Sequence, residues 1–104
     1  MDSGKLEFGD GKATYTYKGI VYDLGSYPYE PCLYIIKDDV HICTLHNAYT
    51  VEQLRKTFTA GGKVRNYQDT VYDEEAFCRV LAAVLDNKRN DMDFFYAAKL
   101  VKDQ

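Results

Sequence analysis

The first half of the chain alternates apolar and polar residues with a period of two, which is typical of antiparallel strands with one buried face. Primed two-residue turns at Asp10-Gly11 and Lys18-Gly19 set the register of three strands. The predicted pairs are Phe8 with Ala13, Leu6 with Tyr15, Tyr17 with Ile20, Tyr15 with Tyr22 and Ala13 with Leu24. All of these residues fall on one face, and the other face carries Thr14, Thr16, Val21 and Asp23. Because both turns agree, the pattern predicts a meander.

A further hairpin is predicted around Lys37-Asp38-Asp39, with CLYII and VHICTL as its strands. A loop of either two or four residues gives the same division of faces. One face carries Leu33, Ile35, Val40 and Ile42, and the opposite face carries Cys32, Tyr34, Ile36, His41, Cys43 and Leu45. Both faces are largely apolar. The hairpin is therefore either covered on both sides or presents one face to a partner.

Capping signals predict three helices in the second half, at about 51–60, 74–88 and 92–101. Thr50 and Gln53 have the spacing of a capping box, and Gly61-Gly62 supplies a stop. Asp73 is the expected N-cap of the second helix, and Asp91 begins the third. With strands over about 5–46, we expect an α+β fold: a meander of four or five antiparallel strands followed by three helices packed on one face. The length of 104 residues predicts a single domain over 1–104.

Composition narrows the compartment and the class of protein. The N-terminal stretch has no apolar h-region, and Arg79 interrupts the longest apolar run, AFCRVLAAVL, so we expect neither a signal peptide nor a membrane-spanning helix. Three cysteines without a secretory signal indicate reduced thiols in the cytosol. No established catalytic signature occurs in the chain. We therefore expect no enzyme activity, no cofactor and no membrane partner.

The run VHICTLHNA contains two histidines and a cysteine. Strand alternation places His41 and Cys43 on one face together with Cys32, and it sends His46 to the other face unless the strand ends first. These four residues are candidate metal ligands, or Cys43 is a nucleophile with a histidine as its base. The chain has no tight pair of cysteines of the kind that structural zinc sites use, and free cysteines are often buried. We therefore favour ordinary strand residues here, and we predict no metal site.

One basic stretch stands out in a chain of net charge −3. It contains Arg55, Lys56, Lys63 and Arg65, and the aromatic residues Phe58 and Tyr67 lie between or beside them. This composition suits phosphate contacts and base stacking, so a nucleic-acid-binding accessory protein is the alternative function. The simpler interpretation is a solvated helix face followed by a loop. We favour the simpler interpretation, because an acidic chain lacks the broad positive surface of a nucleic-acid binder.

The tract SYPYEP places Tyr27 and Tyr29 on a stiff, proline-containing connection. It is either a contact loop for a protein, since tyrosine offers a large contact area at a low entropy cost, or a long connection whose rings fold over the sheet edge. Our main hypothesis is a non-enzymatic module that binds a protein partner or itself. The expected contact residues are Tyr27, Tyr29, Tyr34 and Ile36.

Four strings along the chain carry a resemblance: YKGIVYDLG, EPCLYI, CTLHNAY and AFCRVLAA. Together they resemble small uncharacterised proteins encoded on conjugative transposons of Firmicutes, over most of the chain. The resemblance implies a bacterial, cytoplasmic accessory protein of a mobile genetic element, with unknown activity. It implies no functional residue, because that family has no established site to match.

Overall fold

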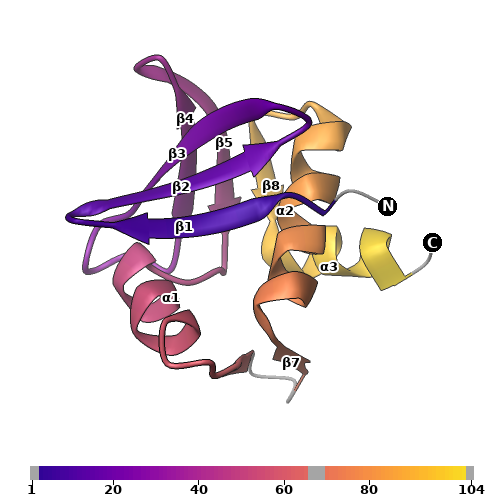
Figure 1. Ribbon diagram of the computed structural model, residues 1–104. Helices are drawn as coiled ribbons and strands as arrows, with labels where there is room; N and C mark the ends of the chain where they lie inside the picture. Colours follow the sequence, from indigo (N-terminus) through magenta and orange to yellow (C-terminus); the bar gives the residue numbers. More distant parts are fainter. Residues whose placement is uncertain (1–2, 66–69, 103–104) are drawn as a thin grey trace.

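The computed structural model describes residues 3–65 and 70–102. Five strands in chain order form an antiparallel meander (Figure 1): β1 (Lys5–Gly9), β2 (Lys12–Tyr17), β3 (Ile20–Gly25), β4 (Leu33–Lys37) and β5 (Val40–His46). A sixth strand, β8 (Asp91–Asp93), lies parallel to β5 at the edge of the same sheet. The fold is α+β, with the helices after the meander, as the sequence predicts.

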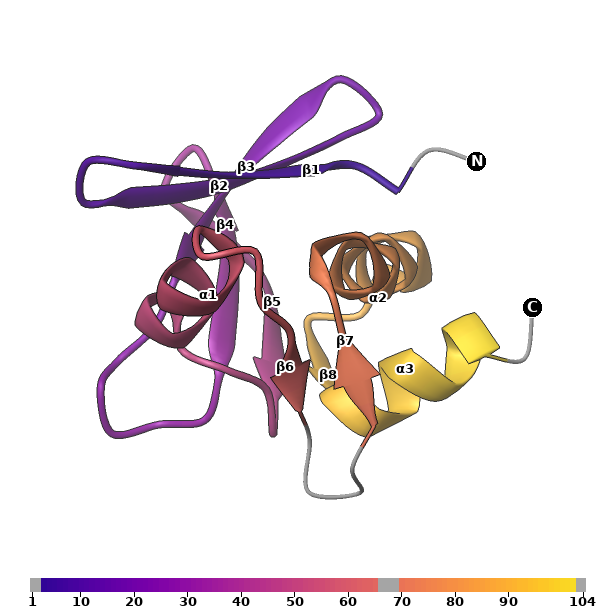
Figure 2. The same cartoon turned by 60° about the horizontal axis from the view of Figure 1, so that its bottom comes forward.

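Three helices follow the strands: α1 (Val51–Phe58), α2 (Glu74–Asn87) and α3 (Phe94–Lys102). A short ribbon of β6 (Val64–Arg65) and β7 (Val71–Tyr72) lies between α1 and α2. In Figure 2, β1, β2 and β3 pass over α1 and α2, so the sheet curves around the helical layer. We call the helix-covered side of the sheet the inner face. All three helices contribute buried side chains to it.

The predicted register of the first three strands is confirmed. Leu6 pairs with Tyr15, and Tyr15 pairs with Tyr22 on its other side. The remaining predicted pairs also occur: Phe8 with Ala13, Tyr17 with Ile20 and Ala13 with Leu24. Lys18 and Gly19 both have positive φ, as a primed turn requires. Asp10 does not have positive φ, so the first turn is not of the primed type that the sequence predicts. Its two-residue length nevertheless gives the predicted register.

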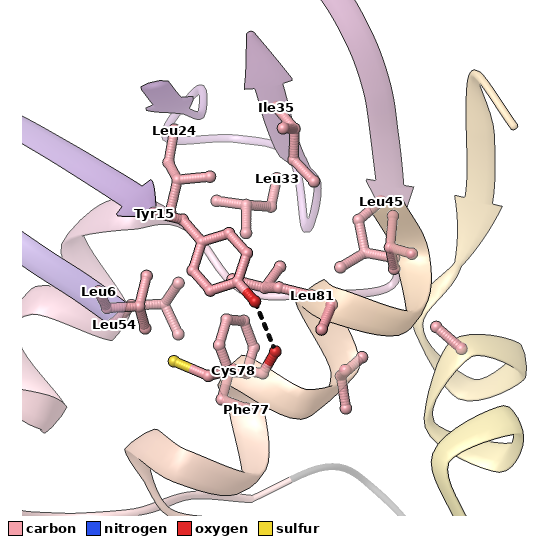
Figure 3. Close-up of a cluster of buried hydrophobic side chains, with 14 of the residues drawn as sticks. Leu6, Tyr15, Leu24, Leu33, Ile35, Leu45, Leu54, Phe77, Cys78 and Leu81 are labelled. Atoms are coloured by element: carbon pink, nitrogen blue, oxygen red, sulfur yellow. Dashed lines mark hydrogen bonds between the residues drawn. The ribbon is translucent and has the colours of Figure 1, made fainter. Parts of the chain in front are cut away.

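The core lies between the inner face and the helices (Figure 3). Tyr15 is fully buried at its centre, and its hydroxyl lies 2.7 Å from the carbonyl oxygen of Ser3 and 3.1 Å from that of Cys78. These acceptors satisfy the only polar atom that the Tyr15 side chain brings into the core. Four aromatic side chains, from the three helices and the loop before α1, pack against one another in the same core: Tyr49, Phe58, Phe77 and Phe94.

A β-bulge in β5 overturns the predicted division of faces in the second hairpin. The turn has two residues, with Asp38 and Asp39 both at positive φ, and Ile36 pairs with His41 as expected. The next pair is Ile35 with Cys43, so Ile42 is an extra residue in β5. From Cys43 onward, every side chain of β5 is on the face opposite to the predicted one. Cys43 and Leu45 are consequently buried on the inner face beside Leu33 and Ile35.

The helix N-termini form as their signals predict, with one exception. Thr50 makes a complete capping box with Gln53, and the Asp73 side chain accepts a hydrogen bond from the backbone N–H of Ala76. Asp91 does not begin the third helix, because residues 91–93 are strand β8 and bury Met92. The carboxylate of Asp93 instead accepts from the backbone N–H of Phe95 and caps α3.

Candidate functional site

The opposite side of the sheet, which we call the outer face, is not covered by any of the three helices. Its residues on β3, β4 and β5 are Val21, Asp23, Tyr34, Ile36, His41, Thr44 and His46, and Cys32 lies directly before β4. Val21 is 55% exposed, and Tyr34 and Ile36 are only half-buried. The sequence left open which face of the 32–45 hairpin the helices cover. In the described residues they cover the Leu33 and Ile35 face, and they leave the Tyr34 and Ile36 face open.

The tyrosines of the 26–31 connection extend this open surface. Tyr27 packs edge-on against Tyr34, with ring centroids 5.6 Å apart, and Tyr29 is 96% exposed. The Tyr34 hydroxyl donates to the Glu30 carboxylate at 2.8 Å. This hydrogen bond and the desolvation of the phenol raise the pKa of Tyr34 to about 12. Tyr27, Tyr34 and Glu30 thus hold one another in place, while the Tyr29 ring lies free of the surface.

Acidic side chains surround the open surface. Asp23 lies opposite Ile36 across β3 and β4, and Glu30 contacts Tyr34. Asp38 and Asp39 form the exposed turn at the end of the hairpin, and Asp91 adds a further carboxylate beside β5. Lys37 is tied to Asp38 at 2.9 Å, so its charge is locally compensated. The surroundings of the apolar surface are therefore predominantly negative.

Three side chains of the outer face are aligned as a thiol, a base and a carboxylate. Cys32 Sγ lies 3.6 Å from His46 Nδ1, and His46 Nε2 lies 2.9 Å from Asp91 Oδ2. Cys32 is half-buried, while the His46 and Asp91 side chains are 42% and 66% exposed. Burial and the negative charges of Glu30 and Asp91 raise the pKa of the Cys32 thiol. The resting form of Cys32 is therefore the neutral thiol.

Backbone contacts fix this alignment. Continuing the pairing of Leu33 with Leu45 by one residue brings Cys32 beside His46. The backbone N–H of Ala48 donates to the Pro31 carbonyl at 2.7 Å and closes the end of the β4–β5 pair. On the other side of β5, strand β8 runs parallel and places Asp91 beside Thr44. Three segments distant in sequence therefore position three side chains.

The predicted cluster of Cys32, His41 and Cys43 on one face is wrong. The bulge turns Cys43 inward, where it is 1% exposed and burial raises its pKa to about 11. His41 remains on the outer face, but its Nε2 is bonded to the Thr44 hydroxyl at 2.7 Å. His46 was expected on the face opposite to His41, and the same bulge brings it to the outer face. Within residues 3–65 and 70–102, no group of three or more histidine, cysteine or acidic side chains is arranged to hold a metal ion.

The four cations of the basic stretch do not form a uniform positive surface. Arg55 donates to the Gly9 carbonyl at 2.6 Å, lies over the Phe8 ring and is 3.6 Å from Glu52. Lys63 lines a small recess that also contains Asp73 and Glu75. Lys56 and Arg65 are exposed, and Tyr67, the aromatic residue expected beside them, lies outside the described residues. Arg55 therefore has a structural role, and Lys63 shares its recess with two carboxylates and with Arg79.

A groove of about 640 Å³ lies on the helical side of the molecule, between α2 and α3. Its walls are mainly apolar, with Val80, Phe95 and Val101 among them, and Arg79, Lys99 and Lys102 lie along it. Arg79 is already paired with Glu75. No sequence pattern predicts this groove, because most of its lining comes from two helices and β7, and no local pattern encodes their relative placement.

Comparisons with known proteins do not assign the chain to a family: no family model, curated protein or solved structure matches it. Within the described part of the chain, none of the helices has both the length and the apolar character needed to cross a membrane.

Proposed function

We propose that the outer face binds a protein partner and that the chain acts as a non-enzymatic interaction module. The observation that carries this proposal is the position of Tyr34 and Ile36 on a face without a helical cover, next to the exposed rings of Tyr27 and Tyr29. Tyrosines and apolar side chains gathered on an open surface are typical of interface centres. They are also costly to leave in water unless a partner covers them.

Charge complementarity supports a partner with a basic surface. The acidic side chains around the face, among them Asp23, Glu30 and Asp91, attract lysine and arginine side chains and increase the rate of association. A second copy of the chain is disfavoured, because its own acidic side chains would lie opposite these ones. We therefore favour a different protein, one that presents apolar anchors surrounded by basic residues.

The cellular setting is part of the same proposal. The resemblance to proteins of conjugative transposons supports an accessory role in a bacterial mobile element. All three cysteines, Cys32, Cys43 and Cys78, are free, which fits a reducing compartment such as the cytoplasm. No cofactor is needed for binding through this face.

Nucleic-acid binding through the basic stretch is the weaker candidate. Arg55 contacts Gly9, Phe8 and Glu52, and the recess that Lys63 lines also contains the carboxylates of Asp73 and Glu75. Fluorescence titration with single- and double-stranded DNA over a salt series tests it. If no salt-dependent binding occurs at low ionic strength, this candidate is excluded.

Site-specific photo-cross-linking in the native host tests the main proposal. A photoreactive p-benzoylphenylalanine replaces Tyr29 on the outer face, and a matched variant carries it at Tyr96, which is 46% exposed on α3. We expect one host protein with a basic surface to be cross-linked from position 29 and not from position 96. Adducts only from position 96, adducts between two copies of this chain, or no adduct at either position would contradict the proposal.

A further inference from the structure

We propose that Cys32 is a nucleophilic thiol that undergoes exchange with small, positively charged disulfides, with His46 as its base and Asp91 as the residue that positions His46. The inference is independent of the protein partner and concerns a covalent modification site on the same face. It is carried by the alignment of the three side chains, with Sγ 3.6 Å from Nδ1 and Nε2 2.9 Å from the carboxylate.

The contact with Asp91 determines which nitrogen of His46 can accept a proton. An ionised carboxylate only accepts hydrogen bonds, so the ring nitrogen that faces it, Nε2, carries the hydrogen. In the neutral ring, Nδ1 then has a free lone pair, and this is the nitrogen that faces Cys32. A nucleophile bonded to a base, and a base bonded to an orienting carboxylate, is the arrangement that activates thiols and hydroxyls.

Cys32 needs a base because its environment disfavours the thiolate. Burial and the charges of Glu30 and Asp91 raise its pKa, so little thiolate forms spontaneously at neutral pH. A thiol of higher pKa is a stronger nucleophile once its proton is removed. Proton transfer to His46 produces an imidazolium that Asp91 stabilises, and it therefore yields thiolate at the moment of reaction.

The proposed exchange is balanced in atoms and electrons. The Cys32 S–H proton moves to His46 Nδ1, and the thiolate attacks one sulfur of a disulfide R–S–S–R. A Cys32–S–S–R bond forms as the original S–S bond breaks, and the second sulfur leaves as a thiolate. That thiolate takes the proton from His46 and departs as R–SH. The disulfide is the only oxidant, and no oxyanion-binding site is required.

The charges beside Cys32 determine which disulfide is preferred. Glu30 and Asp91 both act on the thiol electrostatically. They repel disulfides that carry carboxylates and attract those that carry amines. The other two thiols are excluded by burial, because Cys43 is 1% exposed and Cys78 is 3% exposed, and burial raises the pKa of Cys78 to about 12. They are internal controls within the same chain.

Reaction with cystamine, which is cationic, and with 3,3′-dithiodipropionate, which is anionic, tests the preference. The full-length protein is incubated with each disulfide at neutral pH, and peptide mapping by mass spectrometry follows each cysteine. Each rate at Cys32 is divided by the rate at Cys32 in the same chain unfolded in urea, which removes intrinsic differences between the reagents. We expect Cys32 alone to react in the native protein, with a normalised preference of about tenfold for cystamine. Reaction first at Cys43 or Cys78, or an equal normalised rate for both reagents, would overturn the proposal.

Variants of His46 and Asp91 test whether these residues act as the base and its positioning residue or only as charges near Cys32. His46→Gln is expected to slow Cys32 by at least about a hundredfold at neutral pH, and the deficit should disappear at high pH, where the thiol ionises without a base. The matched control is His41→Gln, since His41 lies on the same strand and contacts Thr44 instead. Asp91→Asn is the decisive variant. With the neutral 2-hydroxyethyl disulfide, which Asp91 does not attract, loss of its charge alone lowers the thiol pKa and accelerates the reaction, whereas loss of its positioning role slows it.

We expect Asp91→Asn to react more slowly than the unmodified chain, with an unchanged urea midpoint. A faster Asp91→Asn, or a His46→Gln variant as reactive as His41→Gln, would refute the mechanism. If a variant fails to fold, the pH profile of the unmodified protein still decides the matter. A rate at Cys32 that follows only the thiol's own ionisation, with no activity at lower pH from a base, would refute it as well.

Discussion

Deletion of Ile42 tests the bulge that determines which residues reach the outer face. Ile42 is the extra residue of β5, so its removal leaves Ile36 paired with His41 and Ile35 paired with Cys43, now in unbroken alternation. No other side chain has to change face. The loss is that of one half-buried side chain, about 1 kcal/mol, since full burial of an isoleucine contributes about 1.5–3 kcal/mol.

The matched deletion is that of Thr14, on a strand without a bulge. Ala13 and Tyr15 flank Thr14 and are both buried and paired on two sides, so one of them must turn outward when Thr14 is removed. Expulsion of Tyr15 costs about 3–5 kcal/mol. This is a large part of the roughly 5–15 kcal/mol by which native domains are stable.

Urea unfolding monitored by far-ultraviolet circular dichroism measures both free energies. We expect deletion of Ile42 to lower the free energy of unfolding by about 1 kcal/mol, and deletion of Thr14 to lower it by about 3–5 kcal/mol. In the chain that lacks Ile42, Cys43 should remain unreactive toward a reagent that modifies exposed thiols. Equal losses for the two deletions, or exposure of Cys43, would refute the reasoning about the bulge.

Two further predictions concern local contacts. Thr50→Ala removes the capping box of α1 and should lower the free energy of unfolding by about 1 kcal/mol in urea denaturation, and a loss near zero would show that the box contributes nothing. Tyr34→Phe tests the bond to Glu30: the Tyr34 pKa is about 12 in the fold against an ordinary 10, so the native state favours the protonated phenol. The stability that this contributes is present below pH 10 and is lost as the pH rises from 10 to about 12. The difference in the free energy of unfolding between the unmodified chain and Tyr34→Phe should therefore disappear over that range. Tyr29→Phe is the control. If the difference in the free energy of unfolding between the two chains does not change over this pH range, the hydrogen bond from Tyr34 to Glu30 is not its source.

Local signals in the sequence were sufficient for most of the fold. Two-residue turns fixed the first three strands, and capping residues located the N-termini of α1 and α2, because both depend on side chains within a few positions of one another. Strand β8 was missed because it has only three residues and pairs with β5, which lies far away in the sequence. The triplet Asp91–Asp93 directly precedes the apolar residues of α3, so in the sequence it resembles the first turn of that helix.

The alignment of Cys32, His46 and Asp91 could not be predicted from sequence patterns either, because it also depends on pairing between separate segments of the chain. In an unbroken hairpin with the Asp38-Asp39 turn, Leu45 would lie opposite Cys32. The bulge shifts the register by one residue and brings His46 there instead. No local feature of VHICTLHNA marks Ile42 as the extra residue, since bulges depend on how both faces pack.

The affinity of the cross-linked partner for two forms of this chain tests the central claim, that the outer face is the binding surface. Isothermal titration of the purified partner should give a Kd at least about tenfold weaker for Tyr34→Ala than for the unmodified chain, the loss of about 1.4 kcal/mol expected for an aromatic residue at an interface centre. Tyr34→Ala should lower the free energy of unfolding by about 1 kcal/mol, because Tyr34 is half-buried, and urea denaturation should show that the variant is still folded under the conditions of the titration. An unchanged Kd for a folded Tyr34→Ala would contradict the assignment of the outer face.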